Sequence, residues 1–359
     1  MTDTAFSARL VDWQKHHGRH DLPWQNTRDP YAIWVSEIML QQTQVSAVIG
    51  YYQRFLQRFP DIASLAAAEQ EEVLQYWSGL GYYSRARNLH TAAQQIMDEH
   101  GGVFPQAFAD VQALPGIGRS TAAAIVSFAY DSPHPILDGN VKRVFARHFL
   151  IEGWPGTPKI EQRLWALAEA LLPQQDMVAY TQGLMDLGAT LCTRSRPQCT
   201  RCPVSQSCQA FAQGRTAELP TPKPRKSAPQ RQTTMLLLLR GNDILLEKRP
   251  PSGIWGGLWS LPEAAVDEVP QEIAARRYGL ETEALPAMTP LQHAFTHFRL
   301  AITPQPLRVL QSAKADMTNG REPTMTAATI WMPLEDAIGA ALPTPVRTLL
   351  LRLRQHGLA

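Results

Sequence analysis

The chain of 359 residues is predicted to fold as two domains of different class, a mostly helical domain followed by an α+β domain. Three observations support this. Apolar residues recur at helical spacing through residues 1–212, between short Gly and Pro turns. A proline-rich, basic stretch then ends near residue 229, and strand-like runs follow it. We therefore expect a helical domain over 1–212, a semi-rigid linker over 213–229 and an α+β domain over 230–359.

Helical spacing is clearest in three stretches of the first domain, Ala66–Trp77, Ala86–His100 and Ile160–Leu172. Another helix is expected to begin at Asp29-Pro30, because Asp caps a helix N-terminus well and Pro is favoured at the first helical position.

The second domain combines strands with two helices. The expected strands are Thr233–Arg240, Asp243–Lys248, the alternating run Phe298, Leu300 and Ile302, and Thr329–Met332. The first two are joined by Gly241-Asn242, a hairpin signal. Helices are expected over Val269–Tyr278 and from near Pro345.

The charge of the chain does not by itself indicate nucleic-acid binding, since the formal net charge is +2. A DNA surface would have to come from local basic clusters. Two candidates are Arg194, Arg196 and Arg201, and Lys142, Arg143 and Arg147. Any single cluster is more often a solvated face. The sequence lacks an apolar run of membrane-spanning length and a signal peptide, so we expect a soluble, cytoplasmic protein.

All four cysteines lie in one loop, with the spacing Cys192-x6-Cys199-x2-Cys202-x5-Cys208. Such clustering in an intracellular chain indicates metal ligands, whereas a disulfide framework would scatter the cysteines. Four thiolates can close a tetrahedral zinc site or ligate an iron–sulfur cubane. Thiolate chemistry alone supports structural zinc and iron–sulfur equally.

A short turn at Leu114-Pro-Gly-Ile-Gly-Arg-Ser120 separates two expected helices. Pro115 ends the first, over Phe108–Leu114, and the second starts near Arg119. Gly116 and Gly118 let the backbone approach a ligand, and the N–H groups that open the second helix favour an anion. Contacts of this kind position a protein on DNA phosphates. The alternative is an ordinary connection between helices, because Gly-x-Gly is a weak motif.

Glu37 is a candidate general acid. It lies four residues after Ile33 and three after Trp34, so it projects from the apolar face of the helix that begins at Pro30. Desolvation there raises the pKa of a carboxyl group, which can then hold a proton near neutral pH. A leaving base on an N-glycosidic bond needs such an acid. The alternative is a glutamate at the helix edge that reaches water.

The turn at 114–120 resembles the helix–hairpin–helix of the endonuclease III superfamily of base-excision DNA glycosylases, in which an aspartate follows at about the distance of Asp138. The resemblance implies DNA contacts by Gly116, Gly118 and Ser120. Bifunctional members carry a lysine at the position of Ser120, and its amine forms a Schiff base that leads to strand cleavage. Serine cannot form an imine, so base removal without a lyase step is implied.

The cysteine loop also matches this superfamily, because its spacing and its place at the end of the helical domain are those of the compact 4Fe–4S loop. The resemblance therefore implies a 4Fe–4S cluster held by the four cysteines, with a structural or DNA-sensing role, since protein ligands cap all four iron positions.

A narrower resemblance is to MutY-type adenine DNA glycosylases. It is carried by Ser36–Val45, whose sequence is Ser-Glu-Ile-Met-Leu-Gln-Gln-Thr-Gln-Val, by Leu22-Pro23-Trp24, by Gly79–Leu89 and by the Ser120 form of the hairpin. Together these cover most of residues 20–210. The family implies a monofunctional glycosylase of base excision repair. It would hydrolyse the N-glycosidic bond of adenine mispaired with 8-oxoguanine or guanine in double-stranded DNA, as a monomer.

The family's roles carry over to matching positions of this sequence. Glu37 resembles the acid that protonates adenine at N7, and Asp138 resembles the carboxylate that stabilises, or transiently bonds, the oxocarbenium sugar. Asn140 would hydrogen-bond near that centre. Gln42 and Tyr82 resemble the residues that enter the base stack when adenine is flipped out. Two carboxylates in different environments can divide such work, as in glycosidases.

The second domain resembles a Nudix fold in outline, through Gly257-x5-Glu263 and the stretch 271–276 that follows. A working Nudix box needs acidic residues near 275 and 276 to hold divalent cations, whereas this chain has Ala275 and Arg276. We therefore expect a Nudix-like α+β fold kept for recognition, without hydrolysis of nucleoside triphosphates.

In MutY-type enzymes this domain recognises 8-oxoguanine through a loop with Phe, Ser and His. The matching loop here is Phe295-Thr296-His297, in which threonine keeps the hydroxyl donor. Thr296 and His297 are therefore expected DNA contacts. The alternative for His297 is a simple strand edge.

Two other functions remain open. One is an endonuclease III-like glycosylase/lyase for oxidised pyrimidines, against which Ser120, Glu37 and the extra domain argue. The other is a non-catalytic DNA-damage binding protein that uses the hairpin and the cluster as a clamp. Such a clamp would need neither Glu37 on an apolar face nor Asp138 after the hairpin.

Overall fold

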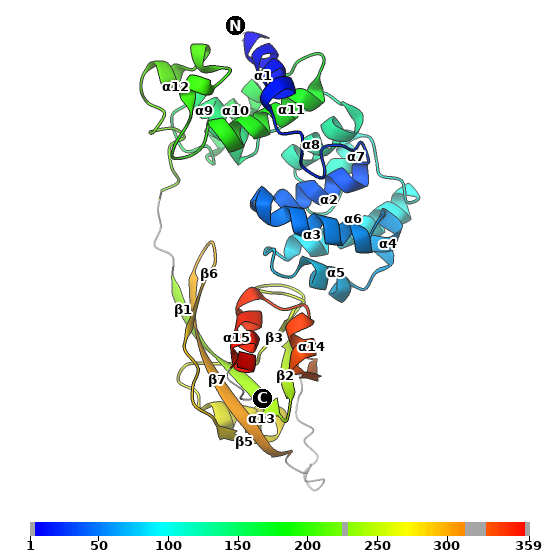
Figure 1. Cartoon of the computed structure of the whole chain (residues 1–359), viewed down its shortest axis with the longest axis vertical. Coiled ribbons are helices and arrows are strands. Elements are labelled where there is room, and N and C mark those ends of the chain that lie inside the picture. Colours follow the sequence, from blue (N-terminus) through cyan, green and yellow to red (C-terminus); the bar gives the residue numbers. More distant parts are fainter. Residues whose placement is uncertain (1–3, 225–228, 313–327, 356–359) are drawn as a thin grey trace. The chain divides into compact units, whose positions relative to one another are not determined.

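The computed structural model describes residues 4–224, 229–312 and 328–355. The chain forms two compact units (Figure 1). The helical unit comprises residues 1–67 and 88–225, and the sheet unit comprises 68–87 and 226–359. Whether 1–212 and 230–359 also fold as separate domains, joined by a linker over 213–229, stays a prediction. Residues 225–228 of that linker lie outside the described residues.

Helices make up the first 212 residues, as the apolar spacing predicts (Figure 1). They are α1 Thr4–His17, α2 Pro30–Leu40, α3 Val45–Arg58, α4 Ile62–Ala67, α5 Gln70–Trp77, α6 Ser84–His100, α7 Phe108–Ala113, α8 Arg119–Tyr130, α9 Gly139–His148, α10 Pro158–Ala170, α11 Met177–Asp186 and α12 Gln209–Ala212. Short helical turns cover Leu187–Leu191 (η1), Cys199–Arg201 (η2) and Ser205–Ser207 (η3).

The start of α2 is capped as predicted, because the Asp29 side chain accepts a hydrogen bond from the Tyr31 N–H and Pro30 opens the helix. One predicted helix is wrong. The stretch 66–77 is divided between α4 and α5, since Glu69 takes an extended backbone conformation and becomes the N-cap of α5.

The core of the helical unit lies between α1, α9 and α11. Phe6 and Leu10 of α1 are fully buried, as are Phe145 of α9 and Leu184 of α11 to within a percent. Gly183 lets α1 and α11 approach closely, because a Cβ there would lie 3.1 Å from the Leu10 side chain. Leu219, inside the predicted linker, is also buried, and its carbonyl accepts from Arg147 Nε at 2.8 Å. The chain is therefore packed at that point.

The sheet unit contains one eight-stranded sheet with the central order β3-β2-β1-β7-β5. Its strands are β1 Gln230–Arg240, β2 Asp243–Lys248, β3 Trp259–Ser260, β4 Glu263–Ala264, β5 Leu280–Ala284, β6 Leu291–Ala294, β7 Arg299–Ser312 and β8 Thr329–Pro333. β1 and β7 run parallel over ten residue pairs, and the other pairings are antiparallel. The predicted hairpin is confirmed, with Gly241 at φ +58° between β1 and β2.

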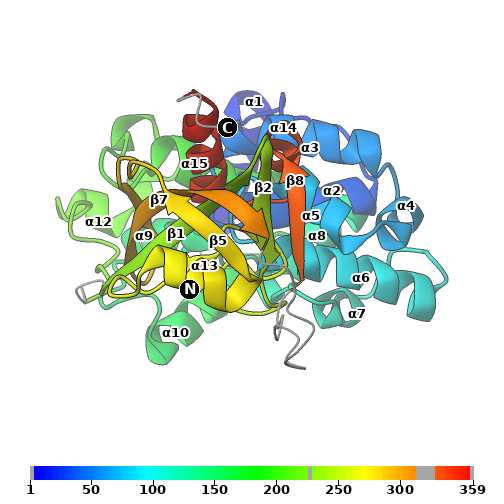
Figure 2. The same cartoon turned by 90° about the horizontal axis from the view of Figure 1, so that it is seen from below.

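Helices cover both faces of this sheet (Figure 2): α13 Pro270–Tyr278 on one side and α15 Thr344–Gln355 on the other, with α14 Leu334–Gly339 beside β8. Leu236 and Leu238 of β1 pack with Ile273 of α13. The intervening residues of β1 are buried as well, so both faces of β1 are in a core. This agrees with the aliphatic run at 235–239.

In the described part of the chain, no helix combines the length and the apolar character that a membrane span requires.

Candidate active site

Glu37 lies in the second half of α2, where the sequence places it on the apolar face. Its neighbours one turn away, Ile33 and Trp34, are almost fully buried. The glutamate keeps partial exposure because it lines a cavity of about 330 Å³ in the helical unit. Its role as a general acid stays a prediction.

The electrostatics of Glu37 favour the protonated form. Burial and, to a smaller extent, the charge of Asp138 raise the pKa of its carboxyl from an ordinary value of 4.5 to about 8. Both causes act in the same direction, so the carboxyl holds its proton at neutral pH.

Asp138 occupies the N-cap of α9, where its Oδ1 accepts from the Val141 N–H at 2.8 Å and its Oδ2 accepts from Asn140 Nδ2 at 3.3 Å. Burial is the largest cause and leaves the pKa of Asp138 above its ordinary value, although these hydrogen bonds and the charge of Arg143 oppose the rise. Hydrogen bonds and the charge of Arg143 thus stabilise the anionic form of Asp138. Both contributions to the pKa of Glu37, in contrast, favour its protonated form. Asp138 lies near enough to Glu37 to act on its pKa and is hydrogen-bonded to Asn140, although Asp138 is not among the residues that line the cavity.

Arg143 connects the Asp138 loop to the cysteine loop, a link for which the sequence gives no signal. Its Nη2 donates to Asn140 Oδ1 and to the Gly188 carbonyl, each at 2.7 Å, and its Nε donates to the Cys192 carbonyl at 2.7 Å. A Cβ at Gly188 would lie 2.5 Å from the Asn140 Cβ, so η1 packs tightly on α9. Asn140 therefore sits between Asp138 and the first cysteine.

Several cavity residues were missed by sequence reasoning. The cavity around Glu37 is also lined by Trp24, Arg28, Ser36 and Gln182. Gln182 is oriented by Asp186, whose Oδ1 accepts from Gln182 Nε2 at 2.8 Å. Helical spacing between these two positions is visible in the sequence, but nothing there indicates that α11 faces α2.

An ion pair with a fully buried carboxylate lies beside Gln182. The backbone N–H of Arg19 donates to Asp186 Oδ2 at 2.8 Å, and its Nε donates to Oδ1 at 2.7 Å. The side chain of Asp186 has no solvent exposure. This pair fixes the carboxylate that orients Gln182.

The two glycines of the hairpin differ in what they require. Gly116 has φ +79°, and a Cβ there would lie 2.8 Å from the Asn88 Cβ. Gly118, the N-cap of α8, has the ordinary φ of −87°, and a Cβ there would meet nothing within 4 Å. Gly116 is thus needed for the fold of the turn, whereas Gly118 leaves the start of α8 open.

Ser120 has a partner inside the protein. Its Oγ accepts from the N–H of Leu137 at 2.9 Å, so the residue directly before Asp138 is tied to the first turn of α8. The hairpin and the Asp138 loop are therefore joined through Ser120.

The two predicted base-stack residues both lie at turns with unusual backbone conformation. Gln42 follows α2 with φ +55° and is exposed. Tyr82 precedes α6 with φ +49° and keeps 42% exposure. Non-glycine residues at positive φ cost about 1–3 kcal/mol and are frequent at functional sites. Tyr83, in contrast, is buried, so of these two tyrosines it is the core residue.

The four cysteines line one small cavity of the helical unit. Arg147 holds the loop around it: its Nη1 donates to the Thr193 carbonyl at 2.7 Å and lies 3.4 Å from Cys192 Sγ. Within the described residues, no three His, Cys, Asp or Glu side chains are grouped closely enough to hold a metal ion. The iron–sulfur cluster therefore stays a prediction.

The chemistry of this donor set fits a positively charged metal group. Burial raises the pKa of the Cys202 thiol to about 12 and also raises the pKa of Cys199 and Cys208. Thiolate is the ligating form, so the set requires bound positive charge to be deprotonated.

One of the two predicted basic clusters is not a free surface. Arg147 is 2% exposed, and Lys142 pairs with Glu161 at 2.7 Å. Arg143 donates to the side chain of Asn140 and to two backbone carbonyls. These side chains are used for packing because α9 lies against the cysteine loop. The other cluster, Arg194, Arg196 and Arg201, is exposed.

In the sheet unit, Thr296 and His297 are exposed in the turn between β6 and β7, which is closed by a hydrogen bond from the Phe295 N–H to the Phe298 carbonyl. Both residues line a cavity of about 590 Å³ that Tyr82 and Trp255 also line. The structure thus brings three of the predicted DNA contacts to one cavity, and it adds Trp255, which sequence reasoning missed.

Two relatives show the family to which this chain belongs. The adenine DNA glycosylase of Buchnera aphidicola subsp. Acyrthosiphon pisum is 35% identical to this chain over 99% of each. The adenine DNA glycosylase of Mus musculus is 32% identical over 98% of this chain and 78% of its own length. The chain belongs to the adenine DNA glycosylases. It is therefore an enzyme of base excision repair, as the sequence predicts.

Family models divide this adenine DNA glycosylase in two. The model described as HhH-GPD superfamily base excision DNA repair protein matches residues 35–170, and the NUDIX domain model matches residues 234–352. The predicted helix–hairpin–helix and Nudix-like folds are thereby confirmed.

Solved structures resemble the glycosylase part. A thermostable thymine-DNA glycosylase has a TM-score of 0.54 and 28% identity, and the match covers 58% of this chain and 96% of that one. The endonuclease III of a non-covalent complex with DNA has a TM-score of 0.50 at 21% identity, over 60% of this chain and 98% of that one, which shows a shared fold.

The two hairpin glycines of this adenine DNA glycosylase give a matched pair of variants. Gly116→Ala should lower the free energy of unfolding by about 1–3 kcal/mol, because it places a side chain at positive φ against Asn88. Gly118→Ala should change stability by less than about 1 kcal/mol and still weaken binding to duplex DNA, because its Cβ projects into the open space where a phosphate would lie. Urea unfolding and fluorescence anisotropy measure the two effects. Undiminished DNA affinity of Gly118→Ala would exclude close backbone approach at that position.

The raised pKa of Glu37 predicts a pH-dependent stability. Between about pH 4.5 and about pH 8 the folded state holds a proton that the unfolded state releases, so stability falls as pH rises through this window. Glu37→Gln removes this loss. The variant should be more stable than wild type at pH 8, and the difference should shrink toward pH 4.5 by up to about 1.4 kcal/mol per pH unit. Urea unfolding at both pH values tests this, with Glu99→Gln on the exposed side of α6 as control. A constant difference between the variant and wild type would contradict the raised pKa.

Proposed function

We propose that this adenine DNA glycosylase removes adenine that is paired with 8-oxoguanine or guanine in duplex DNA and leaves the DNA strand uncut. The observation that carries the proposal is the pair of carboxylates Glu37 and Asp138, which interact electrostatically. Hydrogen bonds and Arg143 stabilise the anion of Asp138, whereas no such contribution favours the anion of Glu37. One can hold a proton at neutral pH while the other carries the charge.

Glu37 is the general acid of the proposed reaction. Its carboxyl opens into the cavity of the helical unit, which is the place for an extruded base. Proton transfer from Glu37 to N7 of adenine cancels the negative charge that the base would otherwise gain when the bond pair of the N-glycosidic bond moves onto it. The departing base is then neutral, and the sugar keeps the positive charge.

Asp138 stabilises that positive charge as an anion. Its two oxygens are held by Val141 and Asn140, so the carboxylate is oriented before the sugar develops charge. Preorganised groups of this kind stabilise a transition state without reorganisation during the reaction. Water then adds to the sugar carbon and completes hydrolysis, and the proton that the water loses passes to a general base. Ser120 offers no amine, so no imine with the sugar forms and the strand stays intact.

Base extrusion would use the exposed turns. Gln42 and Tyr82 are placed at element ends with their side chains open to solvent, which suits insertion into a base stack. Unstacking costs a few kcal/mol, which an inserted amide and an aromatic ring can offset. In the cavity, Gln182 offers an amide for the edge of the base, and Trp24 offers an aromatic surface.

The hairpin would hold the phosphate backbone through the N–H groups that open α8, next to Gly118. Recognition of the opposite base would fall to Thr296 and His297, because they line the cavity of the sheet unit together with Tyr82. The Thr296 hydroxyl and the imidazole of His297 are suitable partners for the polar edge of 8-oxoguanine.

Cys192, Cys199, Cys202 and Cys208 would hold a 4Fe–4S cluster. Bound there, the cluster supplies positive charge that keeps the thiolates deprotonated and ties the loop into one rigid piece. Arg143 extends that rigidity to Asn140 and so to Asp138. We also propose that the enzyme acts as a monomer in the cytoplasm, as the sequence predicts.

A base-release assay with split samples tests the function. A duplex with adenine opposite 8-oxoguanine is incubated with the enzyme and then analysed with and without hot alkali. Breakage should appear after alkali treatment alone, since the product is an abasic site in an intact strand. A duplex with adenine opposite thymine is the matched control and should stay whole. Breakage without alkali would favour a glycosylase/lyase, and no breakage in either sample would favour a non-catalytic clamp.

A further inference from the structure

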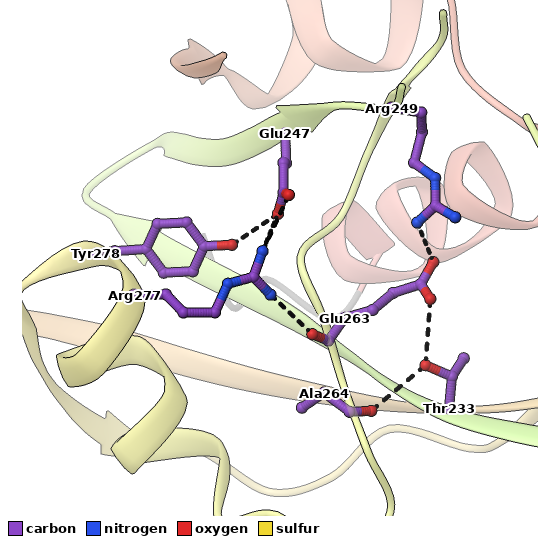
Figure 3. Close-up of polar contacts among 7 residues, drawn as sticks. All are labelled: Thr233, Glu247, Arg249, Glu263, Ala264, Arg277 and Tyr278. Atoms are coloured by element: carbon purple, nitrogen blue, oxygen red, sulfur yellow. Dashed lines mark hydrogen bonds and ion pairs between the residues drawn. The ribbon is translucent and has the colours of Figure 1, made fainter. Parts of the chain in front are cut away.

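The sheet unit contains a half-buried acidic centre. It consists of Glu247 at the end of β2, whose carboxylate points toward Arg277 and Tyr278 of α13, and Glu263 of β4, whose side chain points toward Arg249 and Thr233 (Figure 3). Their side chains are 18% and 28% exposed. Glu263 is the glutamate of the Gly257-x5-Glu263 pattern, and a NUDIX domain model matches this part of the chain. Half-buried carboxylates of this kind require a cation, since an unpaired buried charge is strongly unfavourable.

Arg277 supplies one cation to this centre. Its Nη2 donates to both oxygens of Glu247, at 2.9 and 2.8 Å, and its Nη1 donates to the backbone carbonyl of Glu263 at 3.0 Å (Figure 3). The hydroxyl of Tyr278 donates to Glu247 Oε2 at 2.7 Å. Burial and the charge of Glu247 raise the pKa of Tyr278 well above its ordinary value, so the phenol remains a donor.

Arg249 supplies the second cation. Its Nη1 donates to Glu263 Oε1 at 2.8 Å, and the hydroxyl of Thr233 lies 3.4 Å from Glu263 Oε2 (Figure 3). Each of the four carboxylate oxygens therefore has a polar partner within the protein. Two glutamates and two arginines also balance in charge, so a divalent cation here would bring uncompensated positive charge.

The residues present therefore do not fit a metal site of the kind that a Nudix fold implies. We infer that Arg249 and Arg277 act as internal cations at the acidic centre of the sheet unit, where they replace a divalent metal ion and tie β2, β4 and α13 together. The centre is closed to metal-bound phosphates, and the stability of the unit is independent of divalent cations.

Arg277→Gln tests this, with Arg276→Gln as the matched control. Both variants remove one positive charge from the same turn of α13, but Arg276 pairs with Glu268 at the surface and is 68% exposed. The full-length wild type should melt at the same temperature in EDTA and in excess Mn²⁺. Arg277→Gln should melt several degrees lower in EDTA and recover part of the loss in Mn²⁺. Arg276→Gln should behave as wild type.

A double variant covers the case in which Arg277→Gln does not fold. Arg277→Met combined with Glu247→Leu removes both charges and should fold, with no response to Mn²⁺, because no buried charge is left unpaired. Direct Mn²⁺ binding, followed by electron paramagnetic resonance, should be absent in wild type and present in Arg277→Gln. A melting temperature of wild type that rises in Mn²⁺ would overturn the inference. So would an Arg277→Gln variant that melts as its control does, or a double variant that fails to fold.

Discussion

The burial of two carboxylates in one helical unit is the constraint on which this structure depends. Glu37 and Asp138 interact electrostatically, so the charge of one raises the proton affinity of the other. The structure resolves the conflict by treating them differently. Asp138 is the N-cap of α9 and receives hydrogen bonds, whereas burial and the neighbouring charge both act to keep Glu37 protonated. Ser120 fixes the backbone before Asp138, and Arg143 fixes Asn140 after it. The parts that look separate in the sequence, the hairpin, the capped helix and the cysteine loop, thus converge on one carboxylate.

The glutamates of the two units differ in their partners, and this difference separates a candidate catalytic glutamate from structural ones. In the sheet unit, Glu247 and Glu263 are each paired with an arginine. Such pairs keep both partners charged. In the helical unit, Glu37 faces a cavity, and its pKa rises to about 8. A carboxyl group with this pKa can donate a proton at neutral pH, whereas a paired glutamate cannot.

Local signals made much of the fold predictable from the sequence. Asp29-Pro30 marks the start of α2, Pro115 ends α7 within a residue, and Gly241-Asn242 joins β1 and β2, because caps and turns depend on neighbouring residues. The division at Glu69 was missed, since the apolar spacing continues across it. The burial of Arg147, and Gln182 as part of the cavity, were also missed, because both depend on which helices pack together. The position of Glu37 on the apolar face of α2 was predictable because it is a local property of that helix.

The central claim is that Glu37 delivers a proton to the departing base, and the pH dependence of adenine release measures it most directly. Single-turnover release from a duplex with adenine opposite 8-oxoguanine should fall as pH rises through about 8 for the wild type. Glu37→Gln should bind the same duplex with unchanged affinity and release little adenine at any pH. Release by Glu37→Gln at the rate of the wild type, with the same pH profile, would contradict the account.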